Sequence, residues 1–425
     1  MGGQPAGSDR PLVSRMSYRT LAHGPYFRAW WAMLFTNLGT NIGWLAILWL
    51  AAARGGPEAV GIVTAAFALP GVVSGVYAGV LLDRMPRALA IALDNGGRAI
   101  LYALVAVEAG QAHFSLVVLT VLVGLGSLLT PLSQAGIWSL VPDLLQEGQT
   151  LGTANAAMNG IWQVATLAGP AAGGLLTARF GPALPIALQA CLYALTAAMM
   201  GGLRGVQAQP GHTLSAWAGL GAVFRTPAVL AVTLFTFAYS FVYAPLEVGL
   251  PSFVAHDLHA KAGSYGVLWA IFAVGALLGS AIWGARRSLP RLGLWLAADF
   301  LAWGLVMAGF SQTRILAPAL LVMAVGGFIY SPYQLWTNTY LQQAVPGTLL
   351  GRLFGAFTAI TGLGLPLGSL AAGALSTAVS LRALIALGGA ACVALGGLAL
   401  AVPTLRRLPD LNLAREGSGG GEETS

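Results

Sequence analysis

The chain alternates long apolar stretches with short polar interruptions. Twelve stretches contain about 20 or more mostly apolar residues, the length that a helix needs to cross the hydrocarbon core of a bilayer. They cover about 28–52, 58–82, 88–108, 113–140, 152–177, 183–203, 227–250, 264–285, 291–310, 314–340, 352–376 and 382–402. The pattern predicts an all-α membrane protein with twelve transmembrane helices.

The longest polar interruption divides these helices into two sets of six. We expect a cytoplasmic N-terminal tail at 1–27, an N-terminal six-helix bundle at 28–203 and a C-terminal six-helix bundle at 227–402. In the linker, 204–226, apolar residues recur at roughly helical spacing, which predicts a short helix lying on the membrane surface. Residues 403–425 end in a Gly/Ser/Glu-rich run and are expected to form a disordered cytoplasmic tail.

The composition agrees with a surface that faces lipid. Of the 425 residues, 57% are hydrophobic and only 8% are charged, whereas soluble domains carry about 25% charged residues. The net charge of +7 does not indicate nucleic-acid binding, because the basic residues stand singly or in pairs and form no basic face. The lipid bilayer is therefore the expected surrounding. Separately, we expect no metal site.

The basic residues are distributed unequally between the two predicted sides. If both termini lie in the cytoplasm, 15 arginines fall on the inner side and 5 basic residues fall on the outer side. Cytoplasmic loops are enriched in Lys and Arg, so this bias favours that orientation and an even number of spans. We expect a multi-pass protein of the cell (inner) membrane, and a monomer.

The two halves resemble each other weakly. Asp94 lies seven residues after Arg87 in the third predicted span, and Asp299 lies eight residues after Arg291 in the ninth. Two pseudo-symmetric six-helix halves are typical of a transporter that arose by duplication and whose site lies between the halves.

One loop motif resembles the major facilitator superfamily. Gly79, Asp83, Arg84 and Arg87 follow that superfamily's pattern between its second and third helices: glycine, three residues, acid, base, two residues, base. Pro86 stands where glycine is usual.

Further motifs resemble the efflux branch that includes enterobactin exporters. They include Leu140-Val-Pro142-Asp143, Gly169-Pro170-Ala-Ala-Gly173-Gly174, Gly275-Ala-Leu-Leu-Gly279 and Gly351-Arg352-Leu-Phe-Gly355. The resemblance implies the major facilitator fold, alternating access and export of small organic molecules, often driven by protons.

The motif at Gly79, Asp83, Arg84 and Arg87 has two interpretations. It could be a solvated turn whose arginines reflect only the enrichment of basic residues on the cytoplasmic side, or it could be a conformational latch. Asp83 ends the second span, where the helix dipole disfavours a carboxylate, so it needs a cation or another helix's N-terminus. The family resemblance favours the latch.

Four charged residues inside spans are gating or coupling candidates. Asp94 and Arg98 are four residues apart and share a helix face, so they form either a structural ion pair or a gate. Glu247 and Asp299 have no basic neighbour on their own helices, and burial disfavours the charged form of a carboxyl. They are candidates for binding and releasing a proton. The alternative for Glu247 is a carboxylate at the membrane interface, and the alternative for Asp299 is a hydrogen bond that serves packing.

Polar stripes on apolar spans predict a cavity that binds substrate. Lipid does not tolerate such stripes, so they must face protein or water, and hydrogen bonding between helices is the alternative explanation. The residues are Asn37, Asn41, Asn155, Asn159, Gln163, Tyr239, Tyr243, Tyr330, Gln334 and Asn338. Gly169, Pro170, Gly173 and Gly174 predict either tight packing or, as the resemblance suggests, a helix bend that seals the pathway.

Together these features predict a proton-coupled exporter of a small organic compound, drug-like or siderophore-like. An importer or a lysolipid flippase on the same fold, and a membrane sensor that no longer transports, are the alternatives. An intramembrane enzyme is disfavoured, because no span carries a metal-binding His pair, a Ser–Lys dyad or a Gly-x-Ser-x-Gly elbow, and no Walker sequence is present. No cofactor is expected, and the proton gradient is the expected energy source.

Overall fold

The structure, a computed structural model, describes residues 24–111, 114–145, 151–203, 221, 223–286, 288–345 and 347–412. The described chain is almost entirely helical, because lipid offers backbone groups no hydrogen-bond partners and a spanning segment must satisfy its own. The N-terminal half contains α2 (Pro25–Arg84), α3 (Arg87–Ala109), α4 (Leu116–Leu144), α5 (Leu151–Phe180) and α6 (Ala183–Gly201).

The described part of the C-terminal half contains eight helices and two very short strands. The helices are α8 (Pro227–His256), α9 (Ala262–Gly284), α10 (Leu292–Ser311), α11 (Leu316–Ala344), α12 (Gly347–Thr361), α13 (Gly364–Leu375), α14 (Leu381–Ala401) and α15 (Pro403–Arg406). The strands β1 (Ser288–Leu289) and β2 (Leu411–Asn412) pair antiparallel.

The helix α2 makes two crossings. Its backbone leaves the helical conformation at Gly55 and Gly56, and Gly56 has φ 64°, a value that glycine adopts without the steric cost of a side chain. Pro57 then starts the second leg, a position that suits its fixed φ. Conversely, α12 and α13 together make one crossing, since Arg352–Leu375 is long and apolar enough to span a bilayer.

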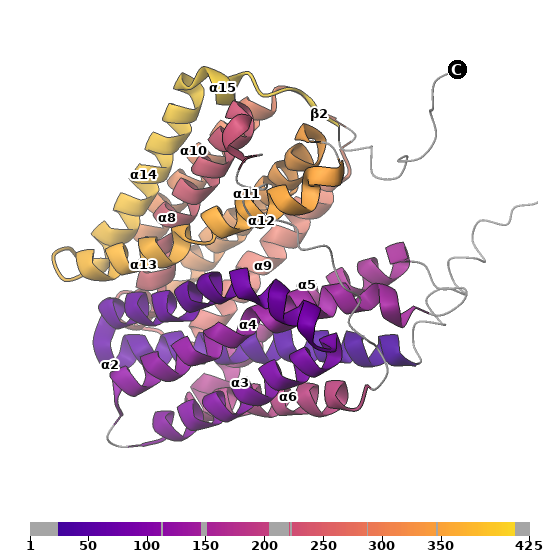
Figure 1. Cartoon of the computed structure of the whole chain (residues 1–425). Helices are drawn as coiled ribbons and strands as arrows, with labels where there is room; N and C mark the ends of the chain where they lie inside the picture. The colour runs from indigo at the N-terminus through magenta and orange to yellow at the C-terminus, as the bar shows by residue number, and fades with distance from the viewer. Residues whose placement is uncertain are drawn as a thin grey trace, which may run out of the picture.

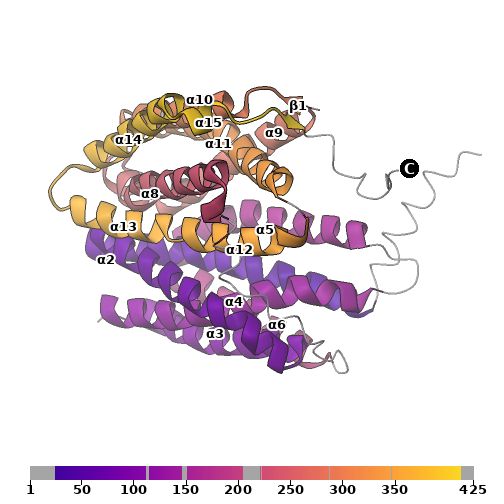
Figure 2. The same cartoon turned by 45° about the horizontal axis from the view of Figure 1, so that its top comes forward.

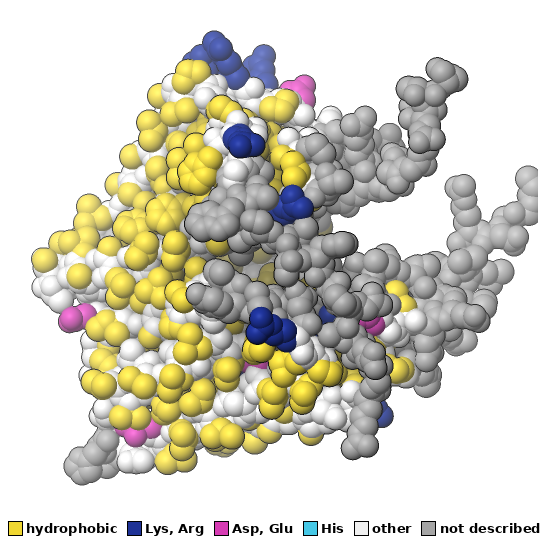
Figure 3. Space-filling view, viewed as in Figure 1, with side chains coloured by type: hydrophobic (Ala, Val, Ile, Leu, Met, Phe, Trp, Pro, Cys, Tyr) yellow, Lys and Arg dark blue, Asp and Glu magenta, His cyan; other side chains and the backbone are white. Residues whose placement is uncertain are grey.

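Ten segments of the described chain meet the length and hydropathy required of a membrane span. The second leg of α2 and the 30-residue α5 bring the crossings to the twelve that the sequence predicts. Figure 3 shows hydrophobic side chains over much of both halves. Val117 is 72% exposed and Leu175 is 69% exposed, which fits a surface in contact with lipid rather than water.

Figure 1 shows the N-terminal half, indigo to magenta, below the C-terminal half, salmon to yellow. The halves meet along a seam where α13 lies beside α2 and α5 lies beside α9. In Figure 2, α13 lies between α8 and α2. The fold is therefore two six-helix bundles that meet mainly through α2 and α5 of the N-terminal half and α8, α9 and α13 of the C-terminal half.

The two ends of the bundles differ in charge. We name as the basic face the end that carries nine arginines of the described chain: Arg28, Arg84, Arg87, Arg225, Arg286, Arg291, Arg352, Arg406 and Arg407. The opposite face carries Arg54, Arg179, Lys261, Arg314 and Arg382. The predicted orientation would place the basic face in the cytoplasm.

The predicted disorder of 403–425 is wrong for residues 403–412. Leu405, Leu408 and Leu411 are buried against the basic end of the C-terminal half, and β2 pairs with β1 in the turn between α9 and α10. The backbone N–H of Arg291 donates to the Asp410 carboxylate at 2.8 Å. We call residues 403–412 the C-terminal strap. Residues 413–425 lie outside the described chain, as do residues 1–23 and most of the predicted linker.

Candidate functional site

The seam between the halves is tight near the opposite face. Val248, Ala372 and Leu384 of the C-terminal half belong to a buried cluster that is otherwise N-terminal, and Leu45 belongs to the main C-terminal cluster. All four lie in the parts of their helices nearer the opposite face. Within the described chain, the buried cluster at the basic end of the N-terminal half, around Tyr26 and Met158, includes no residue of the other half.

Glycines permit the close approach at this seam. A Cβ atom added at Gly174 of α5 would lie 2.6 Å from the Cα atom of Gly266 in α9, and one added at Gly61 would overlap the Ser369 carbonyl oxygen in α13. Real Cβ atoms do not approach backbone so closely. Both contacts lie nearer the opposite face, so we call them the glycine seal.

Glu247 lies at the seam on α8. Its side chain is half-buried, and the Trp44 indole of α2 lies against it as a hydrogen-bond donor from the other half. Tyr243, Tyr265 and Tyr330 are close enough to interact with it electrostatically. None of the three ion pairs recorded in the described chain includes Glu247.

Asp299 is the second carboxylate of the C-terminal half. It lies on α10 with 5% of its surface exposed, and its Oδ2 atom has no hydrogen-bond partner. Tyr239, Tyr330, Tyr333 and the Cys392 thiol are near enough to interact with it electrostatically. No cation of the described chain forms an ion pair with it.

Aromatic rings form a continuous cluster between Glu247 and Asp299. Ring centroids of Tyr330 lie 6.0 Å from Tyr239, 5.9 Å from Tyr243 and 5.6 Å from both Phe272 and Trp303. Tyr243 and Tyr330 are half-buried, whereas Tyr239 and Trp303 are buried. We call Tyr239, Tyr243, Phe272, Trp303, Tyr330 and Tyr333 the aromatic cluster.

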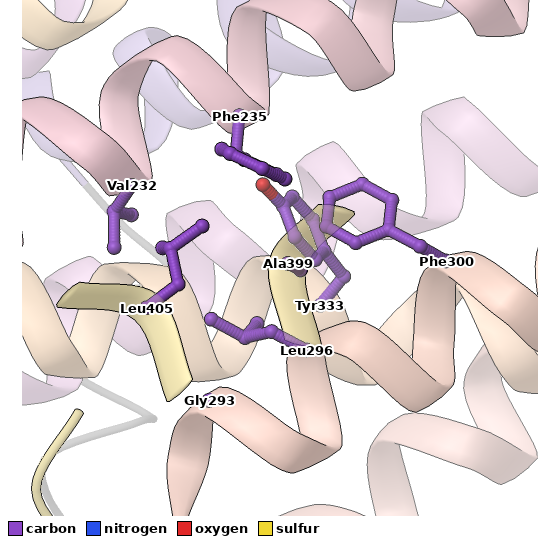
Figure 4. Close-up of a pocket in the computed structure, with 8 residues that line it drawn as sticks. All are labelled: Val232, Phe235, Gly293, Leu296, Phe300, Tyr333, Ala399 and Leu405. Atoms are coloured by element: carbon purple, nitrogen blue, oxygen red, sulfur yellow. The ribbon is translucent and has the colours of Figure 1, made fainter. Parts of the chain in front are cut away.

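A small pocket borders this cluster toward the basic face. Its lining includes Phe300 and Tyr333 with Val232, Phe235 and Leu405 (Figure 4). The Tyr333 hydroxyl shares a hydrogen bond of 2.6 Å with the Thr236 hydroxyl. Because its lining is apolar, this pocket is a gap in the packing rather than a polar binding site.

Asp94 and Arg98 do form an ion pair, as their spacing allows. Arg98 donates through Nε to Oδ1 at 2.7 Å and through a terminal nitrogen to Oδ2 at 3.0 Å. Both side chains are almost fully buried, at 0% and 3% exposure. Ser133 of α4 also bonds to Asp94, and the guanidinium lies 4.3 Å from the Tyr193 ring centroid of α6. The pair is thus enclosed by its own half and does not reach the seam.

The loop motif at the end of α2 makes a different contact from the one expected. Arg87 donates to the Asp143 carboxylate at 2.7 Å, which ties the start of α3 to the end of α4. Arg84 is exposed, and Gly79 lies within α2. The side chain of Asp83 lies outside the described part of the structure. The latch itself stays a prediction, now with Asp143 as a partner of Arg87.

The predicted polar stripes differ in their surroundings. Asn37 and Asn41 are half-buried and donate to carbonyls of their own helix at 2.8 Å each. Asn159 and Gln163 of α5 are exposed, in the part of the helix nearer the basic face. On α11, Gln334 is exposed and Asn338 is half-buried, and the side chain of Asn155 is not described.

The glycines of the predicted bend in α5 make close helix contacts, and one of them, Gly174, lies at the seam. Gly169 packs against Asn41, Gly173 against Ile42 and Gly174 against Gly266. The helix is continuous from Leu151 to Phe180 with Pro170 inside it. The tight packing that we considered is therefore present, and the sealing role stays a prediction.

Several residues of the site were not selected from the sequence. Trp303, Phe272 and Tyr333 stand in apolar spans where aromatic residues carry no pattern of their own. One signal was available: Trp303 follows Asp299 by four residues, as Arg98 follows Asp94. No such spacing links Tyr265 to Glu247 or Asp143 to Arg87, because these partners are distant in the sequence.

Two six-helix bundles that share a seam with carboxylates and aromatic rings define a membrane transporter of small molecules. The family described as Major Facilitator Superfamily matches residues 29–346. The chain belongs to the major facilitator superfamily, which comprises transporters and not enzymes.

Relatives and solved structures agree with this assignment. An uncharacterised MFS-type transporter, y4rN, of Sinorhizobium fredii is 29% identical over 92% of this chain and 98% of its own length. The multidrug efflux pump Tap of Mycolicibacterium fortuitum is 27% identical over 91% of this chain and 97% of its own.

Two solved transporters share the fold at low sequence identity. A nucleoside transporter, NupG, in a mutant form, superimposes with a TM-score of 0.73 at 14% identity, covering 88% of this chain and 99% of its own. A mutant of the peptide transporter POT gives 0.65 at 15% identity, covering 93% and 99%. These likenesses support the twelve-helix architecture alone.

Proposed function

We propose that this protein is a proton-coupled exporter of a small organic compound that works by alternating access. The observation that carries the proposal is the contact between Glu247 and Trp44. It joins a carboxylate of one half to an indole of the other, on the side of the molecule where the glycine seal lies.

A carboxylate at this position couples proton binding to the opening of the glycine seal. An ionised carboxylate accepts a stronger hydrogen bond than a neutral carboxyl does. Protonation of Glu247 therefore weakens its contact with Trp44 and favours separation of the halves at the opposite face. Asp299, which lacks a cationic partner in the described chain, is the second proton-binding group.

The same geometry indicates from which face a substrate can enter the seam in this conformation. The halves are in tight contact near the opposite face, and the polar residues Asn159 and Gln163 are uncovered nearer the basic face. With the basic face in the cytoplasm, substrate enters the seam from the cytoplasm and leaves after the seal opens. The similarity to a protein named a multidrug efflux pump supports export of drug-like compounds.

Vesicles test the coupling. A bacterial host that lacks its own multidrug exporters would express the chain, and a panel of fluorescent dyes of different charge would identify one that inside-out vesicles accumulate. We expect a pH-sensitive dye to report proton release from the vesicle lumen when that substrate is added. Glu247→Gln and Asp299→Asn should both abolish this release, while Glu108→Gln, a carboxylate at the opposite face, should not.

Accumulation that continues after a protonophore collapses the gradient would refute the proton coupling. Uptake by right-side-out vesicles instead of inside-out vesicles would refute the direction.

A further inference from the structure

The N-terminal half contains a complete binding arrangement for a cation. The Asp94 carboxylate holds the Arg98 guanidinium through two hydrogen bonds, and the guanidinium lies over the Tyr193 ring at 4.3 Å. The Tyr102 ring packs edge-on against Tyr193 at 5.6 Å. A carboxylate, a planar cation and aromatic faces thus form one buried unit, and the chain itself supplies the cation.

The described part of the C-terminal half has the carboxylate and the rings, but no cation that pairs with the carboxylate. Asp299 lies in the helix that corresponds to α3 in the internal repeat, and Trp303 stands four residues later, at the place of Arg98. Asp299 is 5% exposed and its Oδ2 atom has no partner. The Tyr239 hydroxyl and the Trp303 indole N–H are also buried without hydrogen-bond partners.

The aromatic cluster extends from this carboxylate to the seam. Tyr239 packs edge-on against Phe300, the neighbour of Asp299, at 4.8 Å, and stacks on Tyr330 at 6.0 Å. Tyr330 in turn contacts Tyr243, and both are half-buried near the seam. A ligand that enters between the halves therefore meets ring faces first and the carboxylate behind them.

This chemistry selects one kind of ligand. Ring faces attract a cation that is weakly hydrated, such as a methylated ammonium group, and the attraction is strongest where water is excluded. A small inorganic cation would need several oxygen ligands, which ring faces do not provide. An anionic group would meet a buried carboxylate and be repelled.

We propose that the substrate carries an organic cation, whose charge is countered by Asp299 and whose apolar groups pack on Tyr239 and Tyr330. The inference rests on the proposed transport function, since it names the substrate class of the same site. In this view the substrate supplies the cation that pairs with Asp299, as Arg98 supplies the cation that pairs with Asp94.

Binding to the purified full-length protein in lipid nanodiscs tests the inference without any gradient. Two dansyl probes would be compared: one carries a trimethylammonium group, and the other carries an uncharged tert-butyl group of the same shape. Energy transfer from tryptophan to dansyl reports binding. We expect the charged probe to bind at least about tenfold more tightly than the uncharged one.

Variants locate the preference. Asp299→Asn should remove it, Tyr330→Leu should reduce it because the ring face is lost, and Tyr330→Phe should retain it because the ring remains. Glu108→Gln is the matched carboxylate control and should bind both probes as the wild type does. Thermal unfolding of each variant shows that the fold is retained.

Equal binding of both probes by the wild type, or an unchanged preference in Asp299→Asn, would overturn the inference. If the charged probe binds through Asp299 but vesicles show no substrate-driven proton release, the proposed coupling fails and the cation site stands. If vesicles export the uncharged probe as well as the charged one, the transport proposal stands and the cation site fails.

Discussion

The two buried aspartates of the repeat differ in what neutralises them. Asp94 in the N-terminal half is held by Arg98, by Ser133 and through Arg98 by the Tyr193 ring. Asp299 in the C-terminal half is also buried, but it has an unpartnered oxygen, and the groups near it in the described chain are three tyrosine hydroxyls and the Cys392 thiol. A charge that is fully paired inside one rigid bundle stabilises structure. A charge that is left unpaired costs stability and is available to a mobile partner.

The largest expected effect is the removal of the paired cation. Arg98→Leu leaves the Asp94 carboxylate buried and uncompensated, so we expect the free energy of unfolding to fall by roughly 3–5 kcal/mol. Thermal unfolding of the detergent-purified protein, followed by size-exclusion chromatography with fluorescence detection, measures the loss. The double variant Asp94→Asn with Arg98→Leu, which has no buried charge, should recover part of it. A loss below about 1 kcal/mol would mean that the N-terminal pair is not structural.

Asp299→Asn should impair transport without lowering stability. No cation of the described chain loses a partner, so stability should be unchanged or higher by about 1 kcal/mol, because a buried unpaired charge is removed. Transport driven by protons should fall by about tenfold or more, because the group that binds the proton and the substrate is neutralised. Unfolding and vesicle uptake, measured on the same preparation, separate the two effects. A destabilised variant with full transport would assign Asp299 a structural role like that of Asp94.

Tyr193→Leu should have an intermediate effect on stability. It removes the ring face beside the Arg98 guanidinium and the hydroxyl that bonds to Gln189 and Thr40, so we expect a loss of roughly 2 kcal/mol. Tyr193→Phe keeps the ring and should lose about half as much. In contrast, Tyr330→Leu in the C-terminal half should change ligand affinity more than stability. Equal losses in the leucine and phenylalanine variants would show that the ring face of Tyr193 contributes nothing.

Asp143→Asn should have the smallest effect. Its pair with Arg87 is partly exposed, with side-chain exposures of 18% for the arginine and 21% for the aspartate. Pairs of this kind contribute roughly 0–1 kcal/mol, and salt screens them. Unfolding at low and high salt should show a small loss only at low salt. A large loss at both salt concentrations would move this pair into the class of Asp94 and Arg98.

The sequence predicted the parts of this structure that depend on local patterns. Twelve spans follow from apolar length, and the Asp94–Arg98 pair follows from a spacing of four on a helix. The contact of Trp44 with Glu247 joins residues from different halves, so no local pattern encodes it. The aromatic cluster was missed in part because a tryptophan or phenylalanine in an apolar span has the same hydropathy whether it faces lipid, core or ligand.

The C-terminal strap shows that composition alone can misplace the boundary between an ordered and a disordered segment. The Gly/Ser/Glu-rich run begins only after residue 415, and the leucines at 405, 408 and 411 recur every three residues and are buried. Composition averaged over residues 403–425 hid this spacing. The disorder that we predicted for the whole segment is therefore wrong for its first ten residues, 403–412.

The C-terminal strap also affects how the protein can be handled in the laboratory. Because it pairs with the turn between α9 and α10, the C-terminal end of the last crossing, α14, is anchored to the C-terminal half. A fluorescent protein or affinity handle joined directly after Ala401 would take the place of this anchor. The same handle joined beyond Asn412 would leave it whole, so the choice of fusion point decides whether an assay reports on the native carrier or on a loosened one.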